Sequence, residues 1–304
     1  MLSTRKTRAQ KPNRLKIRNK AEVLLQRLLT ASVGIPVLLA AIWLGVPWLT
    51  VLVMAAGVAA VWELYRMTPT EVSPLPDLLG MAWVIALISG AQAASGRDNF
   101  LIISGGVVAA GSLVALLWFT AYYRIEDSTG RSSYPLGFAY LVLGPVYVGF
   151  LLATALTLRE LTGEGSPDFG RSWLLFALLV TFAADSGAYG TGRAIGKRPM
   201  APIISPNKTW EGSAGGFTSS VGAAIILGLL LDLASPVWQQ AVIGGVVGVV
   251  AQWGDLVESK LKRIADVKDS GSIIPGHGGL LDRLDSILLA LPAVYFLRVT
   301  VFAS

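Results

Sequence analysis

The chain has 304 residues, of which 53% are hydrophobic and only 14% are charged, and its mean hydropathy is +0.61. A soluble domain has about 25% charged residues, so this composition excludes a water-soluble globule and indicates an integral membrane protein. The lack of cysteine excludes disulfides, thiolate nucleophiles and cysteine-ligated zinc, and the single histidine, His277, excludes multi-histidine metal sites.

The N-terminal segment 1–28 is strongly basic and contains nine of the 25 Lys and Arg residues. No aromatic residues are interleaved with these charges, so we expect no nucleic-acid partner. Basic residues before a first membrane helix favour a cytoplasmic N-terminus, and each is attracted to anionic lipid headgroups by about 1 kcal/mol. We therefore interpret this segment as a cytoplasmic tail that includes an interfacial helix.

Nine apolar windows follow, each close to the roughly 20 residues that span a bilayer as a helix. They cover residues 29–46, 47–65, 77–95, 100–121, 136–157, 172–192, 212–233, 237–257 and 281–303. The sequence therefore predicts an all-α, polytopic integral membrane protein with about nine transmembrane helices. Pro36 and Pro145 fall inside windows and predict kinks or helix boundaries there.

The basic residues also predict the orientation of the chain. With nine spans and a cytoplasmic N-terminus, 21 of the 25 Lys and Arg residues lie on the cytoplasmic side. The exceptions are Arg97, Arg159, Arg171 and Arg298. This asymmetry favours a cytoplasmic N-terminus and an external C-terminus in a plasma (inner) membrane. The prediction requires every window to span, and windows 77–95 and 237–257 are the weakest.

Two polar segments, 184–212 and 254–286, interrupt the apolar pattern on the predicted cytoplasmic side. We therefore expect a C-terminal catalytic region at 171–304, preceded by an N-terminal transmembrane region at 29–170. The carboxylates of the two polar segments include Asp282 and Asp285, whose i,i+3 spacing places both on one face of the last helix. Oxygen ligands without cysteine suit a hard cation, most naturally Mg²⁺.

Each carboxylate also has a purely structural interpretation. Asp282 and Asp285 can be an acidic pair stabilised by a helix N-terminus. Asp185, inside the sixth window, is a polar-cavity residue or a buried hydrogen-bond partner. Asp255 and Glu258 have the same i,i+3 spacing as Asp282 and Asp285. Asp255 is expected as a further metal ligand, whereas Glu258 is best interpreted as a solvated interfacial residue.

Cations and glycines accompany these carboxylates. Eight cations either follow the positive-inside rule or neutralise phosphate: Arg193, Lys197, Arg198, Lys208, Lys260, Lys262, Arg263 and Lys268. Residues 276–279, Gly-His-Gly-Gly, predict a tight turn that allows close approach of a ligand, with His277 contacting phosphate, ordering the loop or acting as an acid or base. Residues 205–209 predict a turn that caps the next helix at Thr209. Together these features predict a cytoplasmic Mg²⁺–phosphate site, with a polyphosphate substrate and a lipid co-substrate.

The segment Ser259–Ser286, SKLKRIADVKDSGSIIPGHGGLLDRLDS, resembles the signature of the phosphatidate cytidylyltransferases, also called CDP-diacylglycerol synthases. The segments ADSGAYGTGRAIGKR and SPNKTWEG also resemble that family, whereas the N-terminal third matches only in being hydrophobic. The resemblance implies Mg²⁺-dependent, in-line transfer from CTP to phosphatidate, yielding CDP-diacylglycerol and pyrophosphate. It also implies a second cation, a cytoplasmic active site and a homodimer.

The resemblance assigns three groups of residues. The catalytic group is Asp282, Asp285, Lys262, Arg263 and Lys268. The substrate-binding group is Lys208, Asp185, Ser205, His277, Gly278, Gly279 and Arg283. The metal ligands are Asp255, Asp282 and Asp285.

Two other classes of function stay open on the sequence. A CTP-dependent prenol kinase or a CDP-archaeol synthase would share the metal and phosphate groups, although the Asp-Arg-x-Asp motif at residues 282–285 argues against a kinase. A transporter or channel would hold its substrate near the midplane between related halves, and no related halves are evident.

Overall fold

The protein is described here from a computed structural model, which covers residues 14–67, 74–94, 96–122, 134–163 and 168–302. The described chain is almost entirely helical, with one short β-hairpin. Its elements are α1 (Arg14–Leu44), α2 (Trp48–Arg66), α3 (Pro74–Ala93), α4 (Gly96–Tyr122), α5 (Tyr134–Gly144), η1 (Pro145–Phe150), α6 (Leu151–Arg159), α7 (Phe169–Ile195), β1 (Pro199–Ala201), β2 (Ser205–Thr209), α8 (Trp210–Leu230), α9 (Val237–Ile264), α10 (Leu281–Phe296) and η2 (Leu297–Val301).

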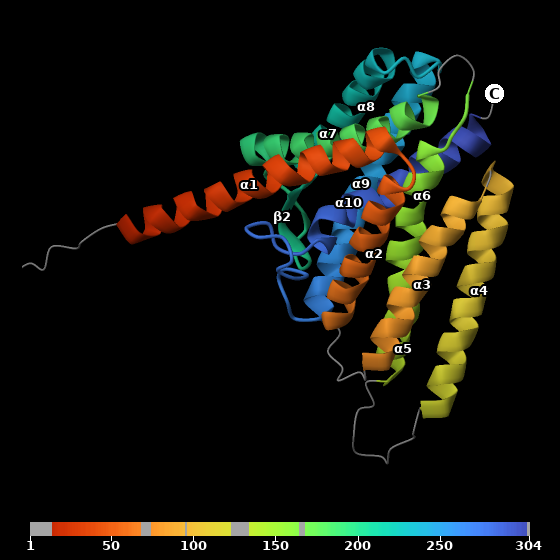
Figure 1. The fold of residues 1–304 in the computed structure, drawn as a ribbon. Helices are drawn as coiled ribbons and strands as arrows, with labels where there is room; N and C mark the ends of the chain where they lie inside the picture. The colour runs from red at the N-terminus through yellow and green to blue at the C-terminus, as the bar shows by residue number, and fades with distance from the viewer. Residues whose placement is uncertain (1–13, 68–73, 95, 123–133, 164–167, 303–304) are drawn as a thin grey trace, which may run out of the picture.

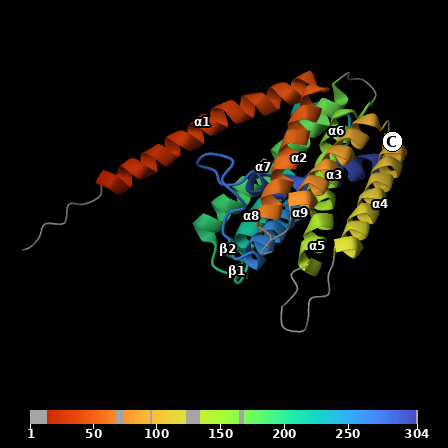
Figure 2. The same ribbon diagram turned by 60° about the horizontal axis from the view of Figure 1, so that its bottom comes forward.

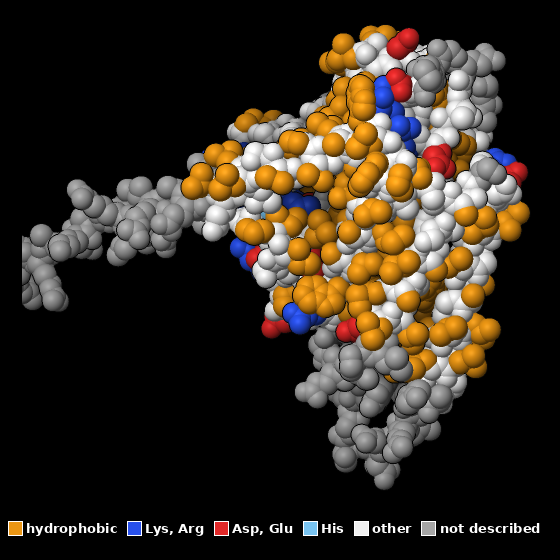
Figure 3. Space-filling view, in the orientation of Figure 1, with side chains coloured by type: hydrophobic (Ala, Val, Ile, Leu, Met, Phe, Trp, Pro, Cys, Tyr) orange, Lys and Arg blue, Asp and Glu red, His pale blue; other side chains and the backbone are white. Residues whose placement is uncertain are grey.

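Within the described residues, eight stretches of helix are long and apolar enough to cross a membrane, which confirms the predicted polytopic, all-α class. They match eight of the nine predicted windows. The remaining window, 77–95, corresponds to the shorter apolar stretch Asp77–Ala93 of α3. Hydrophobic side chains cover most of the face formed by α2, α3 and α4, as expected for a surface that contacts lipid (Figure 3).

The helices form two groups. α2, α3, α4 and the α5–α6 segment lie side by side, whereas α1 and α7 cross them (Figures 1 and 2). α7, α8, α9 and α10 pack against one another in succession. The first turns of α1 extend away from the rest of the molecule in both views. α1 runs through the predicted boundary at residue 28, whereas residues 1–13 of the basic tail lie outside the described residues.

Aromatic side chains fill the core where α4, α7 and α10 meet. Trp173, Phe176, Phe100 and Tyr295 are all less than 2% exposed. The Phe100 and Tyr295 rings make an edge-to-face contact with centroids 5.7 Å apart. α7 and α10, two of the helices that carry predicted site residues, also pack directly against each other.

Small residues bring α7, α8 and α9 into close contact. A side chain at Gly212 or Gly216 on α8 would lie 2.9 Å from a backbone carbonyl oxygen of α7. Gly244 and Gly248 of α9 pack in the same way against α8. The two small-xxx-small pairs of the sequence therefore serve helix packing, as membrane helices commonly use them.

One local expectation is corrected, and two others are confirmed. Residues 205–209 do not form a turn but strand β2, which pairs antiparallel with β1. The predicted cap is confirmed, because the Thr209 hydroxyl accepts a hydrogen bond of 3.1 Å from the Gly212 amide at the start of α8. Pro145 interrupts its window as expected: α5 ends at Gly144, and Pro145 begins the π-helical turn η1.

Two of the four cations predicted on the external side lie together, at the end of the molecule where α1 turns into α2. Arg159 donates a hydrogen bond of 2.8 Å to the Ile42 carbonyl. The Arg171 guanidinium lies 3.8 Å from the centre of the Trp43 ring. Arg159 and Arg171, which the predicted topology places on the same side of the membrane, therefore lie close to the same turn of the chain.

Candidate active site

A cavity of about 710 Å³ lies among α7, the hairpin, α8, α9 and the start of α10. Its volume is within the range of small-molecule sites. It is lined by Phe182, Asp185, Ser186, Ala188, Tyr189, Gly192, Arg193, Met200, Asn207, Lys208, Thr209, Gly212, Ser213, Gln252, Asp255, Asp282, Arg283, Asp285 and Ser286. Both polar segments of the sequence therefore contribute to one cavity.

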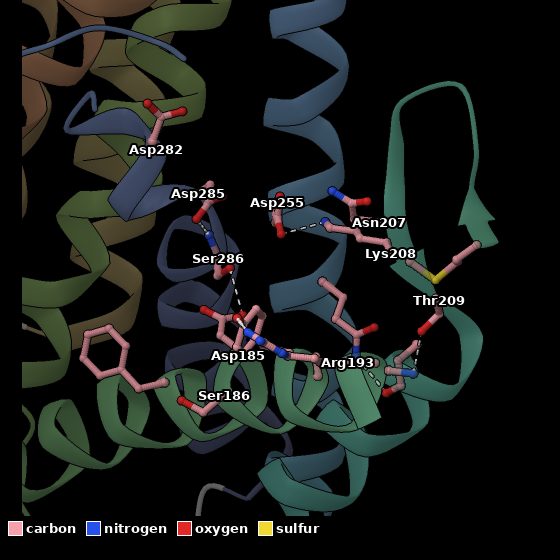
Figure 4. Close-up of a pocket in the computed structure, with 18 of the residues that line it drawn as sticks. Asp185, Ser186, Arg193, Asn207, Lys208, Thr209, Asp255, Asp282, Asp285 and Ser286 are labelled. Carbon is pink, nitrogen blue, oxygen red and sulfur yellow. Dashed lines mark hydrogen bonds and ion pairs between the residues drawn. The ribbon is translucent and has the colours of Figure 1, made fainter. Parts of the chain in front are cut away.

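Carboxylates from three helices surround this cavity: Asp185 from α7, Asp255 from α9 and Asp285 from α10 (Figure 4). The Ser286 hydroxyl donates a hydrogen bond of 3.2 Å to Asp185 Oδ1 and so links α10 to α7. Asp285 Oδ1 accepts a bond of 2.7 Å from the Ser286 amide. These contacts fix the carboxylates while leaving oxygen atoms to face the cavity.

Basic residues lie opposite the carboxylates. Lys208 Nζ, on strand β2, is 2.7 Å from Asp255 Oδ2 (Figure 4). Arg193 also lines the cavity, and its guanidinium donates a hydrogen bond of 2.8 Å to the Tyr189 hydroxyl. Arg283 reaches the cavity while donating to the His277 carbonyl. Carboxylates and cations thus share one water-accessible space, which suits a phosphorylated ligand bound with a divalent cation.

Asp282 has more partners than the other carboxylates. Its Oδ1 lies 2.7 Å from Lys262 Nζ, and its Oδ2 accepts hydrogen bonds from the amides of Ser270 (3.0 Å) and Gly279 (2.9 Å). Asp282 and Asp285 both line the cavity, which confirms that the i,i+3 pair shares a helix face. Their roles nevertheless differ in this structure, because both oxygens of Asp282 are already bound by protein groups.

Glu258 is not the solvated interfacial residue expected from the sequence. Its side chain is 0% exposed, and its Oε2 lies 3.0 Å from Lys262 Nζ. Lys262 therefore bridges two acidic side chains, Glu258 and Asp282. The expectation was wrong because Glu258 lies on the face of α9 that packs on α10, where Lys262 can reach it one turn later.

Several predicted site residues lie outside the cavity lining. The Arg263 side chain is exposed and donates to the carbonyls of Ile204 and Val267. Lys268 is exposed. Ser205 pairs with Ala201 at the start of strand β2. Lys262 does not line the cavity and is connected to it through its ion pairs with Asp282 and Glu258. His277, Gly278 and Gly279 lie in the α9–α10 loop (residues 265–280) and not in the lining.

The predicted Gly-His-Gly-Gly turn is confirmed. Gly276 and Gly278 have φ angles of +76° and +87°, which only glycine adopts easily. The His277 amide donates to the Ile274 carbonyl, so the backbone of this residue orders the loop. α1 supports the turn from outside, since Arg27 Nε donates a hydrogen bond of 2.8 Å to the Gly276 carbonyl.

The side chains of the cavity are chemically suited to Mg²⁺, which prefers oxygen ligands. Asp255, Asp285 and Asp185 supply carboxylate oxygens, and Asn207 supplies an amide oxygen. Within the described residues, however, no three Asp, Glu, His or Cys side chains are close enough to form a ready metal site. Mg²⁺ is usually held by one or two carboxylates together with substrate phosphates. The residues therefore fit a metal ion whose coordination shell is completed by the nucleotide.

Sequence reasoning overlooked several polar residues of the site. Ser286 immediately follows the Asp-x-x-Asp motif, and its link to Asp185 requires knowledge of how α7 and α10 cross. Tyr189 lies four residues before Arg193, which the sequence offered as a phosphate-binding cation, so spacing alone could have placed Tyr189 on the same helix face. Asn207 and Thr209 alternate with Lys208 on a strand that was interpreted as a turn.

Comparisons with known proteins identify the family that the chain resembles over most of its length. The model of a family described as the cytidylyltransferase family matches residues 25–301. A phosphatidate cytidylyltransferase of Bacillus subtilis is 36% identical over 274 residues, covering 90% of this chain and 96% of the relative. Proteins of the same name from Brucella suis (33% identical, 88% and 91% covered) and Staphylococcus saprophyticus (30% identical, 90% and 99% covered) are also similar.

Proposed function

The chain belongs to the cytidylyltransferase family, and from this we propose that it is a phosphatidate cytidylyltransferase that converts CTP and phosphatidate into CDP-diacylglycerol and pyrophosphate. The observation that carries the proposal is the cavity itself. It brings four carboxylates and three cations from the two polar segments together beside helices that are long and apolar enough to cross a membrane. A phospholipid and a nucleotide can meet at such a place.

The reaction is a direct displacement at the α-phosphorus of CTP. An oxygen of the phosphatidate phosphate forms the new P–O bond, and the bond between the α-phosphorus and the bridging oxygen breaks. Pyrophosphate leaves with the bonding electron pair. A phosphate monoester dianion is already nucleophilic, so the site needs no strong general base, which agrees with a lining that contains no Ser-His-Asp arrangement among the described residues.

The protein's part is to position the two substrates and to balance their charge. Lys208, Arg193 and Arg283 line the cavity and are placed to bind phosphate oxygens. Asp255 and Asp285 are the residues that would hold Mg²⁺, with Asp282 joining them on release of Lys262. When bound, Mg²⁺ neutralises the charge that develops on the phosphates. We propose no contact for Arg263 or Lys268.

We also propose that the cavity faces the cytoplasm of a plasma membrane, because the predicted topology places 21 of the 25 basic residues on that side. The second cation and the homodimer implied by the family resemblance remain predictions. The catalytic region proposed at 171–304 contains every residue that lines the cavity.

The test is a nucleotide-transfer assay on purified protein in detergent–phosphatidate micelles with Mg²⁺ and α-labelled CTP. We expect labelled CDP-lipid from the wild type and at least a 100-fold lower rate from Asp285→Asn, because removing a group that stabilises the transition state costs about 3 kcal/mol or more. A folded wild type that forms no labelled lipid would refute the proposed function. Full activity of Asp285→Asn would remove Asp285 from the reaction.

A further inference from the structure

A buried glutamate from the N-terminal half of the chain contacts the α9–α10 loop. Glu63 lies on α2 and is only 1% exposed. Its Oε2 accepts hydrogen bonds from the Leu281 amide (2.9 Å) and from the Ser270 hydroxyl (3.3 Å). Leu281 is the first residue of α10, so Glu63 satisfies a free amide at that helix N-terminus from another helix.

Ser270 connects Glu63 to the candidate active site. Its hydroxyl donates to Glu63, while its backbone amide donates a hydrogen bond of 3.0 Å to Asp282 Oδ2. The Gly279 amide donates to the same Asp282 oxygen. Glu63 and Asp282 therefore hold the same loop from opposite sides, although they are more than 200 residues apart in the sequence.

The loop encloses Glu63 closely. A side chain at Gly279 would place its Cβ 2.7 Å from Glu63 Oε2, and one at Gly271 would place its Cβ 2.9 Å from Glu63 Cγ. Both glycines thus permit an approach that no larger residue allows. An acidic side chain in a membrane helix is costly to bury and is normally retained for a specific partner. The contacts of Glu63 identify that partner as the loop and the first turn of α10.

We propose that Glu63 is a positioning residue: through Ser270 and the first turn of α10, it holds Asp282 and Asp285 in the orientation that the transfer reaction requires. This inference rests on the proposed function for its kinetic consequence. Its structural consequence, an ordered loop from Ser270 to Leu281, is independent of which reaction the cavity supports. Glu63 itself does not line the cavity.

The test compares Glu63→Gln with the control Tyr65→Phe. Tyr65 lies on the same helix, is also buried, and donates a hydrogen bond of 3.2 Å to the Leu141 carbonyl, which is remote from the loop. We expect Glu63→Gln to lower kcat roughly 10-fold, as loss of a charged hydrogen-bond acceptor commonly does, with the KM for CTP within about 2-fold of wild type. Tyr65→Phe should leave both constants unchanged.

Hydrogen exchange provides the measurement that does not depend on activity. In Glu63→Gln, the amides of Ser270, Gly279 and Leu281 should exchange faster, whereas those of α7 and α8 should keep their protection. Ser270→Ala removes the hydrogen bond between Ser270 and Glu63 from the loop side. This variant replaces Glu63→Gln in the test if Glu63→Gln does not fold. In the double variant, the fall in kcat should not exceed that of the more affected single variant, because both substitutions break one connection.

The outcomes separate this inference from the proposed function. Wild-type exchange in the loop of both folded variants would overturn it whether or not the protein makes CDP-lipid. Multiplying losses in the double variant would also overturn it, because independent effects exclude a shared connection. Absence of CDP-lipid synthesis by the wild type would refute the proposed function, and faster loop exchange would then still establish the structural part.

Discussion

Lys208 Nζ on strand β2 lies 2.7 Å from Asp255 Oδ2 on α9, and this pair joins the two polar segments of the sequence across the cavity. The side chains of Lys208 and Asp255 are 21% and 36% exposed and both line the cavity, although the Lys208 Nζ atom itself is buried against Asp255. The pair is therefore suited to open when a metal–nucleotide complex arrives, with Asp255 turning to the cation and Lys208 to phosphate.

Substitution of Lys208 tests this role. Lys208→Met should lower kcat/KM for CTP by about 10- to 100-fold, since hydrogen bonds to charged groups contribute about 1.5–3 kcal/mol. Lys260→Met is the matched control, because Lys260 is an exposed lysine of α9 outside the cavity lining. Equal steady-state constants for the two variants would exclude Lys208 from substrate binding.

Lys262 is expected to be important for stability as well as activity. Its side chain is 14% exposed and lies between Glu258 (0%) and Asp282 (9%). Lys262→Met leaves two acidic groups without their cation, and breaking a buried pair in this way typically costs about 3–5 kcal/mol. Thermal unfolding in detergent should show a clear loss of stability, partly restored in Lys262→Met/Glu258→Gln. No recovery in the double variant would contradict the bridging role.

The link between α10 and α7 predicts a smaller effect. Ser286→Ala removes the 3.2 Å hydrogen bond to Asp185, and a single bond of this kind contributes about 1 kcal/mol, equivalent to roughly 5-fold in rate. Asp185→Asn should lower the rate at least as much, because it also removes a carboxylate from the cavity. Initial rates at saturating CTP check both variants. A rate unchanged by Ser286→Ala would show that the link does not position Asp185.

Metal binding should depend on the nucleotide. Since the described residues contain no ready cluster of three acidic or histidine ligands, Mg²⁺ alone should raise the unfolding temperature little. Mg²⁺ with CTP should raise it clearly, by the mass-action stabilisation that a ligand of the native state provides. Thermal unfolding with each component alone and with both together measures this. An equal shift with Mg²⁺ alone would indicate a complete protein-only metal site.

Sequence reasoning located the site where its residues are close together in the chain. Asp282 and Asp285 are one helical turn apart, so spacing alone placed them on a common face. Hydropathy identified the helices because a membrane-spanning helix requires a long apolar run, whatever its packing. Thr209 was identified as a cap from the residue type and the helix that follows.

Other features depend on three-dimensional packing and could not be read from the chain. Glu63 is a single acidic residue in an apolar window, and nothing local indicates that the α9–α10 loop covers it. Glu258 has the same spacing to Asp255 as Asp285 has to Asp282, yet Glu258 does not line the cavity and is buried against Lys262. Arg263 and Lys268 resemble phosphate-binding residues by charge, but their helix and loop direct them outward. Strand β2 was missed because it is short and contains a proline.

The most direct test of the proposed transfer follows two labels in parallel reactions of the wild type with phosphatidate and Mg²⁺. CTP labelled at the α-phosphate should place its label in the lipid product, whereas CTP labelled at the γ-phosphate should place its label only in pyrophosphate. That distribution is required if phosphatidate attacks the α-phosphorus within the cavity of Asp255 and Asp285. Label from the γ-phosphate in the lipid would contradict it and would identify a kinase.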